Sequence, residues 1–289
     1  MDPLPTVFDR RSVRRNRTRA SHNIAQHDFL YLEVAKQVLE RLSLIKRTFK
    51  RSLDLGCHTG HLKNASELPL GTEIFINSDP SEDMAISAGG PSIVSDEENL
   101  PFADQSLDLI VSSLTLHWVN DLPRALAQIF RCLRPDGLFL AAMFGEDTLD
   151  KLRRSLASAA DGHNRELFPR VSPFIQIKEL GNLLQRTGFT MSVVDIERVT
   201  VDYPSLLSLL KDLRGMGEAN ALNNRCKHFT PRSILQDAEN FYPQNSNGNK
   251  RGIRANFDIL YAIGWAPHKI QRPPLNPGSA KTAMRDALE

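Results

Sequence analysis

The stretch that most constrains this chain runs from Ser52 to Gly60, where a short apolar strand ends in an acid and breaks into a glycine loop. A helix can begin directly afterwards, at residue 61 or 62. Asp54 can bind a polar group of a ligand, and Gly56 allows backbone N–H groups to approach that ligand closely. This arrangement favours a nucleotide or nucleoside at the carboxyl edge of a parallel sheet. His58 departs from the pattern, because such loops most often have a glycine there.

The rest of the chain alternates between strand-like and helix-like patterns. Strands are expected at residues 51–55, 73–77, 92–94, 107–112, 138–144, 189–196 and 257–265, the last as an edge strand. Helices are expected at 28–45, 61–68, 80–88, 121–133, 148–159, 178–186 and, with glycine interruptions, 203–240, and a polar loop at 244–250. Alternation of this kind indicates a doubly wound sheet with right-handed crossovers. The sequence therefore predicts an α/β fold with a seven-stranded, mostly parallel sheet, an N-terminal helical arm and a helical insertion between the sixth and seventh strands.

The 289 residues are enough for one large domain with insertions or for two domains. We expect a basic arm over 1–27, a sheet domain over 28–266 with a helical cover at 197–256, and a disordered tail over 267–289. Six arginines lie between Arg10 and Arg19. They form either a solvated arm or an arm that folds over an acidic partner or an anionic ligand. Asp2 and Asp9 disfavour a transit peptide, because such segments lack acids.

The overall composition excludes several classes of protein. The net charge of +2 is small, so it indicates neither nucleic acid nor a membrane surface as partner. The three cysteines lie far apart, which disfavours a disulfide framework and a cysteine metal site. No apolar run is long enough to form a spanning helix. The oligomeric state cannot be read from these features.

Three acids, Asp54, Asp79 and Asp96, fall at the carboxyl ends of the first three expected strands, and in an open α/β sheet these ends line one crevice. Asp79 lies about 20 residues past the glycine loop, where an acid can bind a ribose diol. Asp96, one strand further, can receive the exocyclic amine of a base. Each acid alone could simply cap a helix. The middle glycine of a dinucleotide loop is missing, so a nucleoside with a charged amino-acid tail fits better, with its amino end at Asp54.

Several blocks of this sequence together resemble the class I S-adenosylmethionine-dependent methyltransferases. They are Leu53–Cys57, Asp79–Ser81, Asp96 with Leu100–Phe102, and the turn Leu133–Gly137. Within that family the chain is similar to the biotin-pathway malonyl-carrier-protein methyltransferase and, more closely, to the mitochondrial complex I assembly factor that acts as an arginine hydroxylase. The closer likeness rests on residues 112–126, 142–149 and 213–218. The resemblance covers roughly residues 8–265.

The resemblance implies a Rossmann-like methyltransferase fold with S-adenosylmethionine as cofactor. The residues that it assigns to the cofactor are Asp54, Gly56, Cys57, His58 and Gly60 at the methionine end, Asp79 at the ribose, Asp96 at the adenine amine and Ser113 facing the methyl group. It also implies a helical cover over the substrate, with a respiratory complex I subunit as a possible protein substrate. The location would be the cytoplasm of a bacterium or the mitochondrial matrix of a eukaryote. The ring of His58 would either crowd the amino-acid end of the cofactor or point to solvent.

No catalytic residue follows directly from the sequence, although two weak candidates lie after the fourth strand. His117 could act as a general base, and Trp118 could form a wall for a cationic side chain. Alternatively, both anchor the loop by packing. Glu146 and Asp147 follow the fifth strand and could bind a guanidinium group or merely cap a helix.

Two further patterns carry less weight. Arg214, a weak substrate candidate, is spaced as an i,i+4 partner of Glu218, which could simply support a helix. Cys57 and His58 are adjacent, but no further ligand lies at useful spacing, so we expect no metal site and no thiolate dyad. No H-x-[DE] pair occurs that could begin an iron-binding triad.

Three hypotheses about function follow. The first is methyl transfer to an unidentified substrate, with a protein among the candidates. The second is an arginine hydroxylase that assembles respiratory complex I. The third is a non-catalytic binding module, which His58 motivates.

Overall fold

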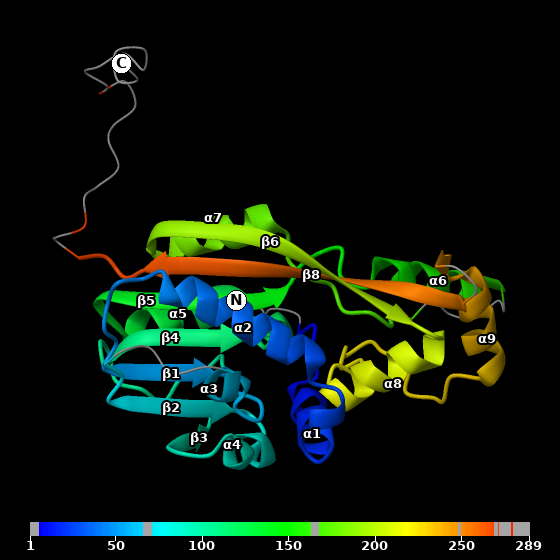
Figure 1. Cartoon of the computed structure of the whole chain (residues 1–289), viewed down its shortest axis with the longest axis horizontal. Helices are drawn as coiled ribbons and strands as arrows, with labels where there is room; N and C mark the ends of the chain where they lie inside the picture. The colour runs from blue at the N-terminus through cyan, green and yellow to red at the C-terminus, as the bar shows by residue number, and fades with distance from the viewer. Residues whose placement is uncertain are drawn as a thin grey trace.

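A computed structural model of the chain describes residues 6–65, 71–162, 168–247, 250–268, 271 and 279. Within these ranges an eight-stranded sheet has the order β3-β2-β1-β4-β5-β8-β6, with β7 paired to β8 (Figure 1). The strands are β1 (Arg51–Leu55), β2 (Ile74–Asp79), β3 (Ser92–Val94), β4 (Leu107–Ser113), β5 (Leu133–Phe144), β6 (Thr190–Tyr203), β7 (Gln244–Asn247) and β8 (Lys250–Trp265). The pairs among β1 to β5 are parallel, whereas β8 runs antiparallel to β5 and β6. The doubly wound, mostly parallel sheet that the sequence predicts is confirmed.

The helices alternate with these strands along the chain. They are α1 (Arg10–Ser21), α2 (Phe29–Ser43), α3 (His61–Ala65), α4 (Glu82–Ala88), α5 (Leu122–Cys132), α6 (Asp150–Gly162), α7 (Ile177–Thr187), α8 (Leu206–Met216) and α9 (Arg232–Phe241), with 3-10 turns η1 (Ile24–Gln26) and η2 (Leu116–Trp118). Asp121 caps α5 as predicted, because its carboxylate accepts the backbone N–H of Arg124 at 3.0 Å. No helix in the described part of the chain is both long and apolar enough to cross a bilayer.

The core lies on both faces of the sheet, and the strand period of two explains how one strand serves both. On β5, Leu138 and Leu140 pack into the cluster that contains α2, whereas Phe139 and Ala141 pack into the cluster that contains α5 and α7. Because both faces are covered, the strand reads as an unbroken apolar run.

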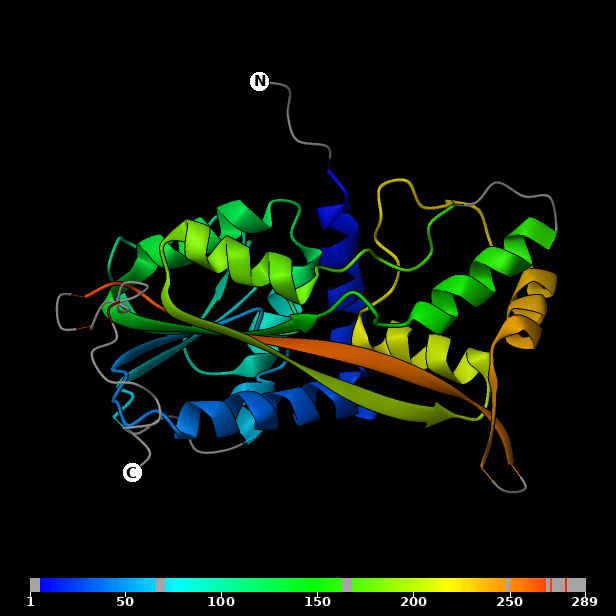
Figure 2. The same ribbon diagram turned by 90° about the horizontal axis from the view of Figure 1, so that it is seen from above.

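The two longest strands, β6 and β8, extend beyond the other strands of the sheet and support a second lobe. β5 pairs with β8 only from residue 259 to residue 265, while β6 stays paired with β8 back to Ile253. The resulting ribbon extends past the sheet toward α6, α8 and α9 (Figure 2). We call these three helices, together with the outer halves of β6 and β8, the cap lobe.

The structure corrects three details of the sequence prediction. β8 is not an edge strand, because it lies between β5 and β6 and leaves β6 at the edge. The polar loop expected at 244–250 contains β7, whose residues 244–247 pair with β8. The region 203–240 is not one interrupted helix, since α8 ends at Met216 and α9 begins at Arg232. Most of the tail expected at 267–289 lies outside the described residues.

The described part of the N-terminal arm contains a helix that packs against the acids at the ends of β2 and β3. α1 is capped by Asp9, and Val13, Asn16, Arg17 and Ala20 are among its buried residues. Its buried positions recur at helical spacing, so one face of an arginine-rich helix is turned inward. The alternative of an arm that is solvated all round is therefore wrong for α1.

Candidate functional site

The glycine loop between β1 and α3 is compact because two of its residues have a left-handed backbone that glycine tolerates. Gly56 has a φ of 75° and Gly60 a φ of 84°. A Cβ at Gly56 would lie 2.3 Å from the side chain of Thr115, and a Cβ at Gly60 would lie 3.1 Å from the backbone of Ala88. Gly56 has no room for a side chain and Gly60 has little, so the loop fits closely against the segment after β4 and against α4.

Asp54, near the end of β1, is a buried acid without a partner. The residue is 1% exposed, and neither carboxyl oxygen has a hydrogen-bond partner among the described residues. Burial, together with the charge of Asp79, raises the pKa of Asp54 to about 8. A buried polar group without a partner costs free energy, so such a group often marks a ligand site. A cationic donor is the ligand group that Asp54 would accept.

His58 points inward rather than to solvent. Its backbone has a φ of 49°, its ring packs at a tilt of 36° against that of Tyr31 with centroids 4.3 Å apart, and the residue is 2% exposed. Nε2 lies 3.2 Å from the carbonyl oxygen of Ser113, which can only accept, so Nε2 carries a hydrogen. Burial lowers the pKa of His58 well below its usual range, and the neutral ring therefore presents a lone pair at Nδ1. Nδ1 is buried and has no partner within the described ranges.

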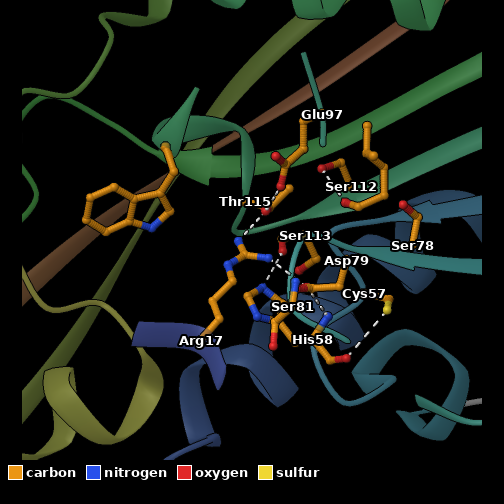
Figure 3. A network of polar contacts seen from close by, with 12 residues as sticks. Arg17, Cys57, His58, Ser78, Asp79, Ser81, Glu97, Ser112, Ser113 and Thr115 are labelled. Atoms are coloured by element: carbon orange, nitrogen blue, oxygen red, sulfur yellow. Dashed lines mark hydrogen bonds and ion pairs between the residues drawn. The ribbon is translucent and has the colours of Figure 1, made fainter. Parts of the chain in front are cut away.

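Asp79, the last residue of β2, is fully buried and has three hydrogen-bond donors. The Ser81 N–H donates to Oδ1 at 2.8 Å. Oδ2 accepts from the His58 N–H at 3.1 Å and from Arg17 Nη1 at 2.7 Å (Figure 3). Burial raises the pKa of Asp79, and the positive charge of Arg17 opposes that rise. Asp79, which the sequence assigns to a ribose, therefore already has an arginine of α1 as its partner.

Asp96, just past β3, is also paired with an arginine of α1. Its Oδ1 lies 2.9 Å from Arg10 Nη2, and the same guanidinium contacts the buried carboxylate of Glu97. Glu97 also accepts a hydrogen bond from the Thr115 hydroxyl at 3.0 Å. Two turns of one helix therefore pair two arginines with three acids, Asp79, Asp96 and Glu97.

The remaining residues assigned to the cofactor, Cys57 and Ser113, are buried in or beside the glycine loop. Ser113 is 5% exposed and offers its carbonyl oxygen to His58. Cys57 is buried, and burial raises the pKa of its thiol, which makes it a poor nucleophile. Within the described ranges, no three histidine, cysteine, aspartate or glutamate side chains gather as metal ligands would.

His117 and Trp118 lie in η2 and share one carboxylate. His117 Nε2 lies 3.1 Å and Trp118 Nε1 lies 3.0 Å from Glu218 Oε2. The other oxygen of Glu218 accepts the Tyr31 hydroxyl at 2.9 Å. Since the Tyr31 ring also packs against that of His58, Glu218 links η2 to the glycine loop. The predicted pairing of Arg214 with Glu218 within a helix is wrong, because α8 ends at Met216, before Glu218.

A cavity of about 250 Å³ adjoins this carboxylate on the cap side. Its walls are mainly apolar and come from α6, α8, η2, β5 and β8, and its polar groups include Glu218, Arg170 and Arg214. The ring of Phe144 packs against both His117 and Phe174, with centroids 4.6 Å and 5.6 Å apart. Pockets of this kind, apolar with a few polar groups, are typical of small-molecule or side-chain binding.

The weak substrate candidates do not converge on one place. Arg214 lines the cavity, although the residue is exposed overall. Glu146 accepts a hydrogen bond from Gln176 at 2.8 Å, and Asp147 pairs with Arg198 at 3.2 Å. The structure thus brings only Arg214 to the cavity.

Four participants were not predicted from the sequence: Arg10, Arg17, Glu97 and Thr115. Arg10 and Arg17 are seven residues apart, which is about two helical turns, so both fall on one face of a helix. That spacing was visible in the arginine-rich stretch. Which acids they would reach was not, because the contacts span from 62 to 98 residues of sequence.

Comparison with known proteins shows to which family the chain belongs. A profile described as a methyltransferase domain matches residues 25–194, which include the glycine loop and all five parallel strands from β1 to β5. The chain belongs to the S-adenosylmethionine-dependent methyltransferase family. Its resemblance to that family, and the cofactor expected from it, are confirmed.

Individual relatives fall into two groups. The chain is 38% identical over 286 residues to the mitochondrial arginine-hydroxylase NDUFAF5 of Danio rerio, covering 97% of this chain and 89% of the relative. The human protein of the same name is 39% identical, with coverage of 96% and 82%. A malonyl-[acyl-carrier protein] O-methyltransferase of Xylella fastidiosa is 31% identical, with coverage of 93% and 96%.

Solved structures support the fold alone. The YcgJ protein of Bacillus subtilis superposes with a TM-score of 0.55 at 16% identity, covering 80% of this chain and 98% of that one. An S-adenosylmethionine-dependent methyltransferase of Thermotoga maritima has a TM-score of 0.50 at 18% identity, with coverage of 88% and 99%.

Proposed function

We propose that this protein is an S-adenosylmethionine-dependent methyltransferase that binds its acceptor in the cavity of the cap lobe. The observation that carries the proposal is the set of buried, unpartnered acceptors beside the glycine loop. Asp54 offers two carboxyl oxygens and His58 offers Nδ1. An ammonium group has three N–H donors and a positive charge, which these acceptors would satisfy. S-adenosylmethionine carries such a group at its amino-acid end, so the residues fit this cofactor.

The remaining assignments follow the strand ends. Asp79 would hold the ribose hydroxyls and Asp96 the adenine amine, with Cys57 and Ser113 flanking the loop. Gly56 and Gly60 would allow the backbone to approach the cofactor closely. When bound, the cofactor supplies an electrophilic methyl group on a positively charged sulfur. The chain contributes by orienting the acceptor and by excluding water from the crevice.

On the acceptor side, Glu218 and His117 are the groups that could handle a proton. Their side chains are 6% and 1% exposed, so they act in a largely dry environment. Glu218 also borders the cavity, where it could accept a hydrogen bond from an acceptor N–H or O–H.

The test is calorimetry with S-adenosylhomocysteine. We expect the wild-type protein to bind it and Asp54→Asn to lose at least tenfold in affinity, because the amide cannot balance the ammonium charge. His58→Gly separates an enzyme from a module that has lost cofactor affinity. If His58 accepts the ammonium group, the glycine variant binds less tightly, whereas restored binding in that variant would support the module. Failure of the wild-type protein to bind the ligand would contradict the proposal.

A second candidate is hydroxylation of an arginine on a protein partner, for which dioxygen would supply the inserted oxygen atom and an external two-electron reductant would convert the other oxygen atom to water. It is favoured by the NDUFAF5 relatives, which match this chain across the cap lobe as well as the sheet. A carboxylate beside Trp118 and Phe144 also suits a guanidinium group. The partner would be a subunit of respiratory complex I, and the location the mitochondrial matrix, or the cytoplasm in a bacterium. Mass spectrometry of the partner separates the candidates, since an added oxygen differs in mass from an added methylene. A partner left unmodified by active protein would count against both.

A further inference from the structure

The guanidinium of Arg17 is paired with Asp79, the acid to which the proposed function assigns the cofactor's ribose. An ionised carboxylate offers about four lone-pair sites, and three N–H groups already donate to Asp79. A ribose diol would add two donors, so at least one present donor must leave. The donors from Ser81 and His58 are backbone N–H groups fixed by the loops. Only Arg17 donates through a movable side chain.

Leaving Asp79 is costly for Arg17 unless another anion takes its place. The residue is 2% exposed, and removing one member of a buried ion pair leaves an uncompensated charge, which is strongly unfavourable. Burial alone would lower the pKa of its guanidinium, yet the charges of Asp79 and Glu97 raise it, so Arg17 stays protonated.

The position of the guanidinium indicates where a new anion would have to lie. Arg17 Nη2 contacts the hydroxyl of Thr115. That same hydroxyl lies 2.4 Å from the point where a Cβ would stand on Gly56. The guanidinium therefore reaches from the ribose acid to the glycine loop, where the amino-acid end of the cofactor is expected (Figure 3).

We propose that Arg17 exchanges Asp79 for the carboxylate of the cofactor's amino-acid end when the cofactor binds. This inference rests on the proposed function. Under this proposal, Arg17 is a cofactor-binding residue that belongs to α1. Two different sets of side chains then bind the two charged groups of the cofactor's amino-acid end. Asp54 and His58 would take the ammonium, and Arg17 would take the carboxylate. Arg–carboxylate pairs are frequently bidentate, which gives the exchange geometric selectivity.

The first experiment compares two ligands by calorimetry. S-adenosylhomocysteine has the amino-acid end, whereas 5′-methylthioadenosine has the same adenosine and a thioether but lacks it. We expect Arg17→Gln to lose at least tenfold in affinity for S-adenosylhomocysteine and to keep or gain affinity for methylthioadenosine, because Asp79 is freed. Arg14→Gln is the matched control, since Arg14 lies on the exposed face of the same helix. It should bind both ligands as the wild type does.

The possible results are distinguishable. If Arg17→Gln changes both affinities in parallel, or neither, Arg17 does not bind the carboxylate and the assignment is wrong. If the wild-type protein binds neither ligand, the proposed function fails and this inference fails with it. Should Arg17→Gln not fold, Arg17→Lys provides the same comparison, with a smaller loss expected because a lysine keeps the charge but not the bidentate geometry.

A second experiment uses the wild-type protein alone. Methylthioadenosine would displace Arg17 from Asp79 without offering a carboxylate, so α1 should loosen. S-adenosylhomocysteine would offer one, so α1 should stay docked. We therefore expect saturating methylthioadenosine to accelerate trypsin cleavage after the arginines at 11, 14 and 15, which are exposed, and S-adenosylhomocysteine not to. Equal cleavage rates with the two ligands would overturn the exchange.

Discussion

The raised pKa of Asp54 has a consequence for stability. An unfolded aspartate ionises near pH 4, whereas folded Asp54 stays protonated up to about pH 8. Between these values the folded state holds one proton more than the unfolded state, so the free energy of unfolding falls as pH rises. We expect Asp54→Asn to be more stable than the wild type at pH 8 and to show a flatter profile from pH 4 to pH 8. Urea unfolding across this range measures it, and parallel profiles would contradict it.

The close packing of the glycine loop predicts the effect of adding a single methyl group at Gly56. Gly56→Ala places a Cβ against Thr115 on a backbone with positive φ, so strain and overpacking add. We expect a loss of at least about 2 kcal/mol in unfolding free energy. Gly162→Ala is the control, because a Cβ there meets nothing within 4 Å. That variant should keep its stability or gain up to about 1 kcal/mol. Similar losses in both variants would refute the packing argument.

At this scale the sequence predicted the acids and glycines of the site but not their present partners. Asp54, Asp79 and Asp96 could be placed because each lies at or just past the carboxyl end of a strand, and parallel strand ends meet at one edge. Arg17 and Glu218 could not be assigned, because their contacts depend on how α1 and the cap lobe dock. The direction of the His58 ring also depends on a tertiary contact, with Tyr31.

At the scale of elements, α8 offers a clean test of the cavity. Leu210 lines it, whereas Leu207 on the same helix is 58% exposed. Leu210→Trp should fill part of the cavity and reduce the fluorescence of bound anilinonaphthalene sulfonate, an apolar probe with an anionic end. Leu207→Trp should leave that fluorescence unchanged. Both variants should still bind S-adenosylhomocysteine as the wild type does. Unchanged probe fluorescence in Leu210→Trp would show that the probe does not bind in this cavity.

Elements inside the sheet were predictable, whereas those at its outer end were not. β1 and β3 match their expected bounds because apolar runs of that length end at turn residues. β6 runs seven residues past its predicted end at 196, because its outer half stays paired with β8 as far as Ile253, with Val199 and Val201 alternating with polar residues. β7 is polar throughout, and only its pairing with β8 makes it a strand.

At the scale of the whole molecule, β6 and β8 belong to both lobes. A strand cannot unpair at one end of the ribbon without weakening the sheet that shares it, so we expect one cooperative unfolding transition. Scanning calorimetry should give a single peak with equal calorimetric and van't Hoff enthalpies. Two separate peaks would mean that the cap lobe is an independent domain. The proposed boundary of the sheet domain at residues 28–266, cap included, rests on this result.

Because two of the three cysteine thiols are buried, the third can be labelled selectively with a dye. Cys57 and Cys132 are buried, and burial raises the pKa of both, while Cys226 is partly exposed. A maleimide dye should therefore attach selectively to Cys226. Its neighbour Arg225 pairs with Asp9 at 3.0 Å, at the start of α1. A dye at this position would report the docking of α1 in real time, without any engineered residue.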